Sequence, residues 1–126
     1  SEVREALLAA RTSAPADYLT HQGWVLIALQ NAFYQLLHAR SLEEGLVNTV
    51  MAGGDTDTTA AIAGALLGAV HGREAVPSRW RRCLLACRMV EGSPTRHPRA
   101  SEYWPADALE LVECLLLAGK SAASET

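Results

Sequence analysis

The stretch GGDTDTT in the middle of the chain places two carboxylates and a hydroxyl within four residues. Asp55, Asp57 and Thr58 offer hard oxygen donors, which suit Mg²⁺, Mn²⁺ or Ca²⁺ and do not suit zinc or copper. Inside a helix, residues two apart point in different directions. Gly53 and Gly54 can adopt backbone angles closed to other residues, so a junction between loop and helix can turn both carboxylates toward one ion. The stretch therefore predicts a site for a hard cation.

The same residues also have a structural use as the start of a helix. Aspartate is a preferred N-cap residue, which suits Asp55, and a second acid such as Asp57 is common in a first helical turn. The two uses are compatible, because a capping carboxylate can keep one oxygen for a metal ion. The sequence pattern leaves both interpretations open.

The number of available ligands bears on the whole chain. A hard cation takes about six oxygen ligands. The motif supplies three side chains at most, and water can supply several more. The other acids that we considered lie on a helix or alone in the sequence: Glu43, Glu44, Asp17, Glu102 and Asp107. If the site is real, some of its ligands come from outside these residues.

Composition predicts one compact globular domain. The chain has 126 residues, of which 49% are hydrophobic and 20% are charged. A net charge of -3, with the two signs mixed, favours neither nucleic acid nor an anionic membrane as a partner. The longest apolar run, residues 60–70, is too short to span a bilayer. The three cysteines form no CxxC pair, so we expect buried free thiols in a cytoplasmic protein without a signal peptide.

The hydrophobic pattern predicts an all-α fold. Val25, Leu29, Ala32 and Leu36 recur at helical spacing, and Ser41 with Glu44 forms the pattern of a capping box. A face of Gly64, Gly68 and Gly72, with three alanines beside it, predicts close approach of another helix. Helices are expected over residues 3–11, 24–39, 42–52, 55–71, 78–92 and 105–119. We expect a loop over residues 93–101 and a frayed tail from residue 120.

The motif and its surroundings resemble a known family. GGDTDTTAAIAGALLGAVHG, followed by Pro77 and Trp80, is similar to the second half of ADP-ribosylglycohydrolases of the dinitrogenase-reductase-activating type. The preceding GWVLIALQNAFYQLL and the closing HPRASEYWPADALELVECLL fit the same order. The resemblance implies a multi-helical, all-α ADP-ribosylglycohydrolase-like fold, with residues 1–126 as a single segment from its C-terminal half. The family's N-terminal half, with its glycine-rich helix and Thr/Ser-Asp-Asp cluster, is not found in these residues.

The resemblance also implies an activity. Members of the family hydrolyse the bond that joins ADP-ribose to a protein side chain or a small acceptor, using two Mg²⁺ or Mn²⁺ ions. Asp55, Asp57 and Thr58 fall on metal ligands of the family, with Asp57 bridging the ions. Gly23 and Trp24 fall near a segment that lines the ADP-ribose pocket, although a tryptophan such as Trp24 is also a common core residue.

Two functions from different classes follow. In the first, the chain is part of a metal-dependent hydrolase, inactive alone because it lacks the other ligands. Its partners would be an ADP-ribosylated protein or an ADP-ribose-containing small molecule, and the missing N-terminal half or another copy of itself. In the second, the chain is a non-catalytic helical interaction or scaffold domain that keeps the motif only as a helix cap. No residue is assigned as the catalytic acid or base.

Overall fold

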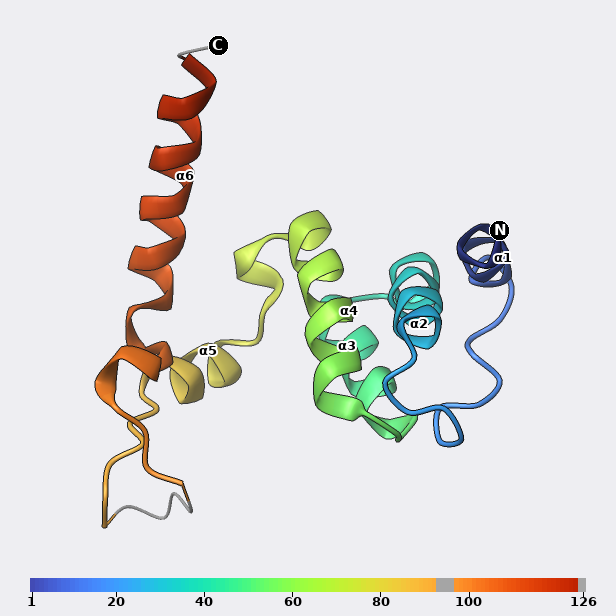
Figure 1. Ribbon diagram of the computed structural model, residues 1–126, viewed down its shortest axis with the longest axis horizontal. Helices are drawn as coiled ribbons and strands as arrows, with labels where there is room; N and C mark the ends of the chain where they lie inside the picture. The colour runs from blue at the N-terminus through green and yellow to red at the C-terminus, as the bar shows by residue number, and fades with distance from the viewer. Residues whose placement is uncertain (93–96, 125–126) are drawn as a thin grey trace. The chain divides into compact units, whose positions relative to one another are not determined.

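The computed structural model describes residues 1–92 and 97–124, with side chains through residue 120. The described residues are helices, turns and loops without a β-strand, which confirms the all-α prediction (Figure 1). Residues 93–96 of the predicted loop and residues 125–126 of the predicted tail lie outside the described residues. The α-helices are α1 Glu2–Ala9, α2 Val25–His38, α3 Leu42–Met51, α4 Thr56–His71, α5 Ser78–Leu85 and α6 Ala108–Ser124, and short 3₁₀ turns lie at Arg73–Ala75, Ser101–Tyr103 and Pro105–Asp107.

The contacts divide the chain into two compact units, Ser1–Pro77 and Ser78–Thr126. In the first unit, α4 packs against both α2 and α3, and α1 packs against α2 (Figure 1). Small side chains fill the interior of this unit, and Ala32, Ala63 and Leu67 are almost completely buried. Small residues let helix backbones approach closely, which holds α4 and its N-terminus firmly against its neighbours.

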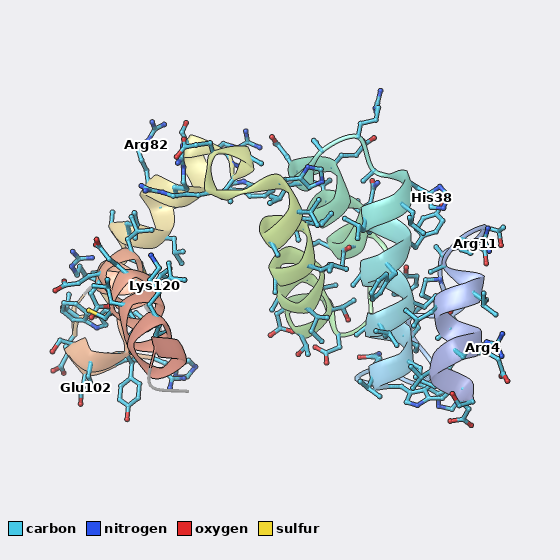
Figure 2. All side chains as sticks on the ribbon, turned by 90° about the horizontal axis from the view of Figure 1, so that it is seen from above. Arg4, Arg11, His38, Arg82, Glu102 and Lys120 are labelled. Atoms are coloured by element: carbon cyan, nitrogen blue, oxygen red, sulfur yellow. The ribbon has the colours of Figure 1, made fainter. Side chains whose placement is uncertain are left out.

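The middle and the C-terminal end of α2 make polar contacts with the segment that follows α1. Gln30 Nε2 donates to the Ser13 carbonyl oxygen at 3.1 Å. His38 Nε2 lies 3.1 Å from the Arg11 carbonyl oxygen, and both residues are labelled at this edge of the unit in Figure 2. A carbonyl oxygen only accepts, so this imidazole carries its hydrogen on Nε2. These bonds fix the connection that leads from α1 toward the loop before α2.

The buried face of α2 is partly polar, which the apolar periodicity did not predict. Asn31 is fully buried and donates through Nδ2 to Thr49 Oγ1 on α3 at 2.9 Å, while Gln35 Nε2 donates to Asn31 Oδ1 at 3.4 Å. The predicted core residue Ala32 is buried, but Val25 is 66% exposed. Buried amides are tolerated here because their polar atoms find partners within the helix pair. The prediction of the buried face was therefore wrong at Val25 and incomplete at Asn31.

The N-terminus of α3 confirms the predicted capping pattern. Ser41 Oγ accepts from the backbone N–H of Glu44 at 3.1 Å. The Glu44 carboxylate accepts from the backbone N–H of Arg40 at 2.7 Å, one residue before the N-cap. The Arg40 guanidinium also donates to this carboxylate, and these bonds hold the pKa of Glu44 below its ordinary value. The motif therefore works as a variant of the capping box.

The glycine face of α4 does not make the predicted close helix contact. A Cβ built on Gly68 would meet nothing within 4 Å, and one on Gly64 would meet only Leu46 at 3.4 Å. The close approach occurs instead at Gly45 of α3, where a Cβ would lie 2.8 Å from Leu67 Cδ1. The side of α4 that packs is the neighbouring stripe, spaced four residues apart, that ends at Leu67. The prediction for the glycine face was wrong because this face meets α3 only at the Leu46 side chain and no helix backbone approaches it.

In the second unit, both α-helices end where the sequence pattern did not predict. α5 stops at Leu85 instead of residue 92, because Arg88 folds back and donates to the carbonyl oxygens of Leu85 and Cys87 at 2.9 Å each. Arginine near a helix end satisfies carbonyls that lack helical partners. α6 continues through Gly119 to Ser124, so the frayed tail is shorter than predicted. The alanine-rich end of this helix favours its continuation.

The three cysteines are free, as predicted, but they are not buried. Cys83 and Cys114 are exposed, and Cys87 is half-buried. They lie in the second unit, in which none of the side chains that the structure describes is fully buried. Within the described part of the chain, no helix is long and apolar enough to cross a membrane.

Candidate metal centre

The turn that enters α4 requires both glycines of the motif. Gly53 and Gly54 have φ angles of 84° and 73°, in the left-handed region that side chains disfavour. A Cβ added to Gly54 would also overlap the carbonyl oxygen of Tyr18. The Thr56 N–H donates back to the Gly54 carbonyl oxygen at 2.9 Å and tightens the turn. The two glycines thus bring the chain around sharply and let the loop at Tyr18 lie directly against it.

Asp55 occupies the N-cap position of α4, yet its side chain makes no capping hydrogen bond. Its backbone carbonyl oxygen accepts the first helical bond, from the Thr59 N–H at 3.0 Å. The N–H that an N-cap side chain would normally accept, that of Thr58, donates instead to Asp57 Oδ1 at 3.0 Å. Asp57 therefore bonds the free N–H at the helix terminus, and the half-buried Asp55 carboxylate remains able to bind another group.

The two carboxyl groups lie next to each other. A hydrogen bond with the Asp55 side chain lowers the pKa of Asp57, and the backbone N–H groups of Thr58 and of Asp57 itself lower it further. A carboxyl can donate to its neighbour only while it holds a proton. Once both groups are ionised, two negative charges face each other at the positive end of α4, an arrangement that a divalent cation would stabilise.

A pocket of about 210 Å³ opens beside Asp55. Four of the predicted site residues line it, namely Asp55, Thr58, Gly23 and Trp24, whereas Asp57 is not among the lining residues. A Cβ built on Gly23, whose φ is 79°, would lie 3.6 Å from Asp55 Oδ2. The segment before α2 therefore reaches the GGDTDT turn at the N-terminus of α4.

Trp24 is a wall residue and not a core residue. Its side chain is 49% exposed, and it borders both this pocket and a larger, open hollow of about 760 Å³ formed by residues 19–24. The ring of His21 meets it edge-on, with ring centroids 6.1 Å apart. An exposed aromatic ring beside a pocket can stack on a planar or sugar-like ligand. This position excludes the interpretation of Trp24 as part of the core.

Six further residues line the pocket and were not predicted as site residues: Val25, Ile27 and Ala28 on α2, and Tyr18, Thr59 and Ile62. Thr59 and Ile62 follow the motif on α4, and the helical repeat from Asp55 places them on the same side. This spacing could have identified both residues. Nothing in the sequence near Tyr18 signals a role, because its contact with Gly54 depends on how the loop folds.

The donor set fits a hard cation in kind but supplies only part of a coordination sphere. Asp55, Asp57 and Thr58 present carboxylate and hydroxyl oxygens, the ligands that Mg²⁺ and Mn²⁺ prefer. In the described ranges 1–92 and 97–124, no group of three or more His, Cys, Asp or Glu side chains is placed to hold a metal ion. These three residues can contribute to a metal site, and the site needs further ligands to be complete.

Comparison with known proteins extends these observations to almost the whole chain. A family model described as ADP-ribosylglycohydrolase matches residues 1–113. The chain belongs to the ADP-ribosylglycohydrolase family. The match includes the loop before α2, the GGDTDT turn and most of the second unit. It confirms the resemblance read from the motif.

Curated relatives match the chain over shorter stretches. ADP-ribosylhydrolase ARH3 from Bos taurus is 50% identical over 42 residues, which cover 33% of the chain and 12% of that relative. The ADP-ribosyl-(dinitrogen reductase) glycohydrolase of Rhodospirillum rubrum is 35% identical over 57 residues, 45% of the chain and 19% of that relative. An uncharacterized protein of Archaeoglobus fulgidus is 47% identical over 65 residues, covering 52% and 21%. The matched stretches thus span about a fifth or less of these relatives. No solved structure matches the chain.

Proposed function

We propose that this chain forms part of a metal-dependent hydrolase that cleaves the glycosidic bond between ADP-ribose and a protein side chain or a small acceptor. Asp55, Asp57 and Thr58 would bind Mg²⁺ or Mn²⁺, and the remaining ligands would come from outside these residues, either from an N-terminal half or from another copy of the chain. Membership of the ADP-ribosylglycohydrolase family supports this class of reaction.

One observation carries the proposal. Asp55 stands at the N-cap of α4 without making a capping hydrogen bond, while Asp57 accepts the Thr58 N–H in its place. If the motif served only as a helix cap, the half-buried Asp55 carboxylate beside the pocket would have no function, because it makes no capping bond. This arrangement argues against the alternative, a non-catalytic scaffold domain that keeps the motif only as a helix cap.

The pocket gives the chain's own residues distinct roles in this proposal. Asp55 and Thr58 would face both the ion and the substrate, because they line the pocket beside Gly23. Asp57 would help to hold the ion and would keep the helix terminus in place through the Thr58 N–H. Trp24 would cover one side of an ADP-ribosyl group. A bound divalent ion would supply Lewis-acid polarisation and a more acidic water.

An exchange of segments tests the proposal. A segment of the chain that contains the GGDTDT turn and α4 would replace its counterpart in ADP-ribosylhydrolase ARH3 of Bos taurus, which is 50% identical to the chain over 42 residues. We expect the exchanged protein to release ADP-ribose from an ADP-ribosylated protein in a metal-dependent manner. The isolated chain, with only part of the ligand set, should release none.

The matched control is the same exchanged protein carrying Asp57→Asn, which keeps the side chain's size and removes its charge. It should fold and lose release of ADP-ribose. A folded exchanged protein that is inactive without this change would refute the proposed function. So would an exchanged protein whose activity is the same with aspartate and with asparagine at residue 57.

A further inference from the structure

Tyr18 lies in the loop before α2 and also touches the turn that enters α4. It lines the pocket that contains Asp55 and Gly23. Its backbone carbonyl oxygen lies so close to Gly54 that no side chain would fit between them. The residue thus touches the metal motif through its main chain and the pocket through its side chain.

The phenol of Tyr18 is bound to a rigid acceptor. Its hydroxyl donates to Asn31 Oδ1 on α2 at 2.8 Å. Asn31 is fully buried and is held in turn by Thr49 Oγ1 at 2.9 Å and by Gln35 Nε2 at 3.4 Å. Thr49 Oγ1 donates onward to the Gly45 carbonyl oxygen at 2.8 Å. A chain of satisfied bonds therefore runs from the core of α2 and α3 to the loop at the pocket.

The direction of these bonds is determined by the groups involved. Gln35 Nε2 can only donate, so the atom of Asn31 that it shares with the Tyr18 hydroxyl is its oxygen, and the hydroxyl therefore donates to it. The opposite amide nitrogen then donates to Thr49. Partial burial raises the pKa of Tyr18 to about 12, with a further contribution from Tyr34, so the phenol keeps its proton and remains a donor at neutral pH.

The residue just before Tyr18 stiffens the same loop. Asp17 Oδ1 accepts from the backbone N–H groups of Leu19 and Thr20 at 2.7 and 3.0 Å. This turn directs the chain from Tyr18 toward Gly23, which reaches the Asp55 carboxylate. Without the phenol bond, that loop would keep its internal turn but lose its side-chain anchor on α2.

We infer that Tyr18 is a positioning residue, which anchors the loop before α2 on Asn31 and thereby holds Gly23 against the Asp55 carboxylate and Trp24 in the pocket wall. The inference rests on the proposed function, since it concerns the geometry of the proposed site. It assigns no contact between Tyr18 and the reacting atoms. The phenol acts through the loop that it holds.

Mn²⁺ titration of the intact chain, followed by NMR, tests this inference. Bound Mn²⁺ broadens the signals of nearby amides steeply with decreasing distance. In the unmodified chain we expect broadening of the amide signals of both Thr58 and Gly23. In Tyr18→Phe, the ratio of open to closed loop should rise by about two- to tenfold, the effect of one lost hydrogen bond. The Gly23 signal should then broaden less than that of Thr58.

Tyr34→Phe is the matched control, because it removes a hydroxyl from a half-buried tyrosine on α2 that does not line the pocket. It should leave both signals as in the unmodified chain. If Tyr18→Phe lowers the melting temperature too far for the titration, Asp17→Ala provides the second test. This substitution changes an exposed side chain, keeps the phenol, and removes the acceptor of the Leu19 and Thr20 N–H groups that stiffens the loop, so it should weaken Gly23 broadening in the same way and leave Thr58 unchanged.

The outcomes separate the two proposals. If Gly23 and Thr58 broaden in Tyr18→Phe as they do in the unmodified chain, the inference about Tyr18 is overturned and the metal site stands. An equal loss in Tyr34→Phe would also overturn it, because a general loosening of α2 would then explain the result. If the unmodified chain shows no broadening at Thr58, the metal site itself fails.

Discussion

Replacing Asp55 by alanine separates a helix cap from a metal ligand. An N-cap side chain that bonds the helix terminus contributes about 1 kcal/mol. Asp55 makes no such bond, because Asp57 accepts the Thr58 N–H. The remaining attraction of a carboxylate to the helix terminus is screened by salt, and Asp57 repels it. We therefore expect Asp55→Ala to lower the melting temperature at high salt by less than about 3 °C.

Ser41→Ala is the matched control for this experiment. Ser41 is the N-cap of α3 in the same unit, and its Oγ does accept a backbone N–H, from Glu44 at 3.1 Å. Its loss should cost about 1 kcal/mol, which for a unit of this size lowers the melting temperature by roughly 4–8 °C. Circular dichroism at high salt measures both variants. If Asp55→Ala melts as early as Ser41→Ala, Asp55 is a cap in solution and the reasoning is wrong.

Three further results are expected from the fold. Hydrogen bonds from Thr20 and Leu19 lower the pKa of Asp17 from 3.8 to about 2. The contribution of Asp17 to stability is therefore complete above pH 3.8 and is lost as the pH falls toward about 2. Asp17→Asn should flatten the pH dependence of the melting temperature over that range. Gly68→Ala, which meets nothing within 4 Å, should stabilise α4 by about 0.5–1 kcal/mol in chemical denaturation, and a destabilised variant would show a hidden contact. Leu115, which is 63% exposed, and its apolar neighbours on α6 form an uncovered surface. We expect such a surface to cause self-association, which ultracentrifugation at high concentration would detect. A clean monomer would contradict this prediction.

The helical architecture could be predicted because its signals are local. Helix starts at Ser41 and Asp55 and the end at Gly72 follow from residue types that favour those backbone conformations, and each was found where it was expected. The ends of α5 and α6 could not be predicted in the same way. The Arg88 side chain bonds the carbonyl oxygens at the end of α5, and this interaction does not change the hydrophobic periodicity of the sequence.

The candidate site was predicted only where its residues adjoin a recognisable motif. Asp55 and Thr58 lie in GGDTDT, and Gly23 and Trp24 were assigned through resemblance. Tyr18 reaches the pocket through a contact with Gly54 and a bond to Asn31, which join segments distant in sequence. Apolar periodicity cannot reveal a buried polar network, because it treats Asn31 as a solvent-facing residue. Which of the two aspartates bonds the helix terminus likewise depends on side-chain geometry, which the sequence does not show.

Calorimetric titration of the intact chain with Mn²⁺ tests the metal assignment most directly. We expect weak binding, which Asp55→Ala and Asp57→Asn each reduce by more than about tenfold because each removes a charged oxygen ligand. Thr58→Val, which removes a neutral donor, should cause a smaller loss. Melting of each variant shows that it is folded at the temperature of the titration. If folded Asp55→Ala and Asp57→Asn bind Mn²⁺ as the unmodified chain does, GGDTDT is here the start of a helix and not part of a metal site.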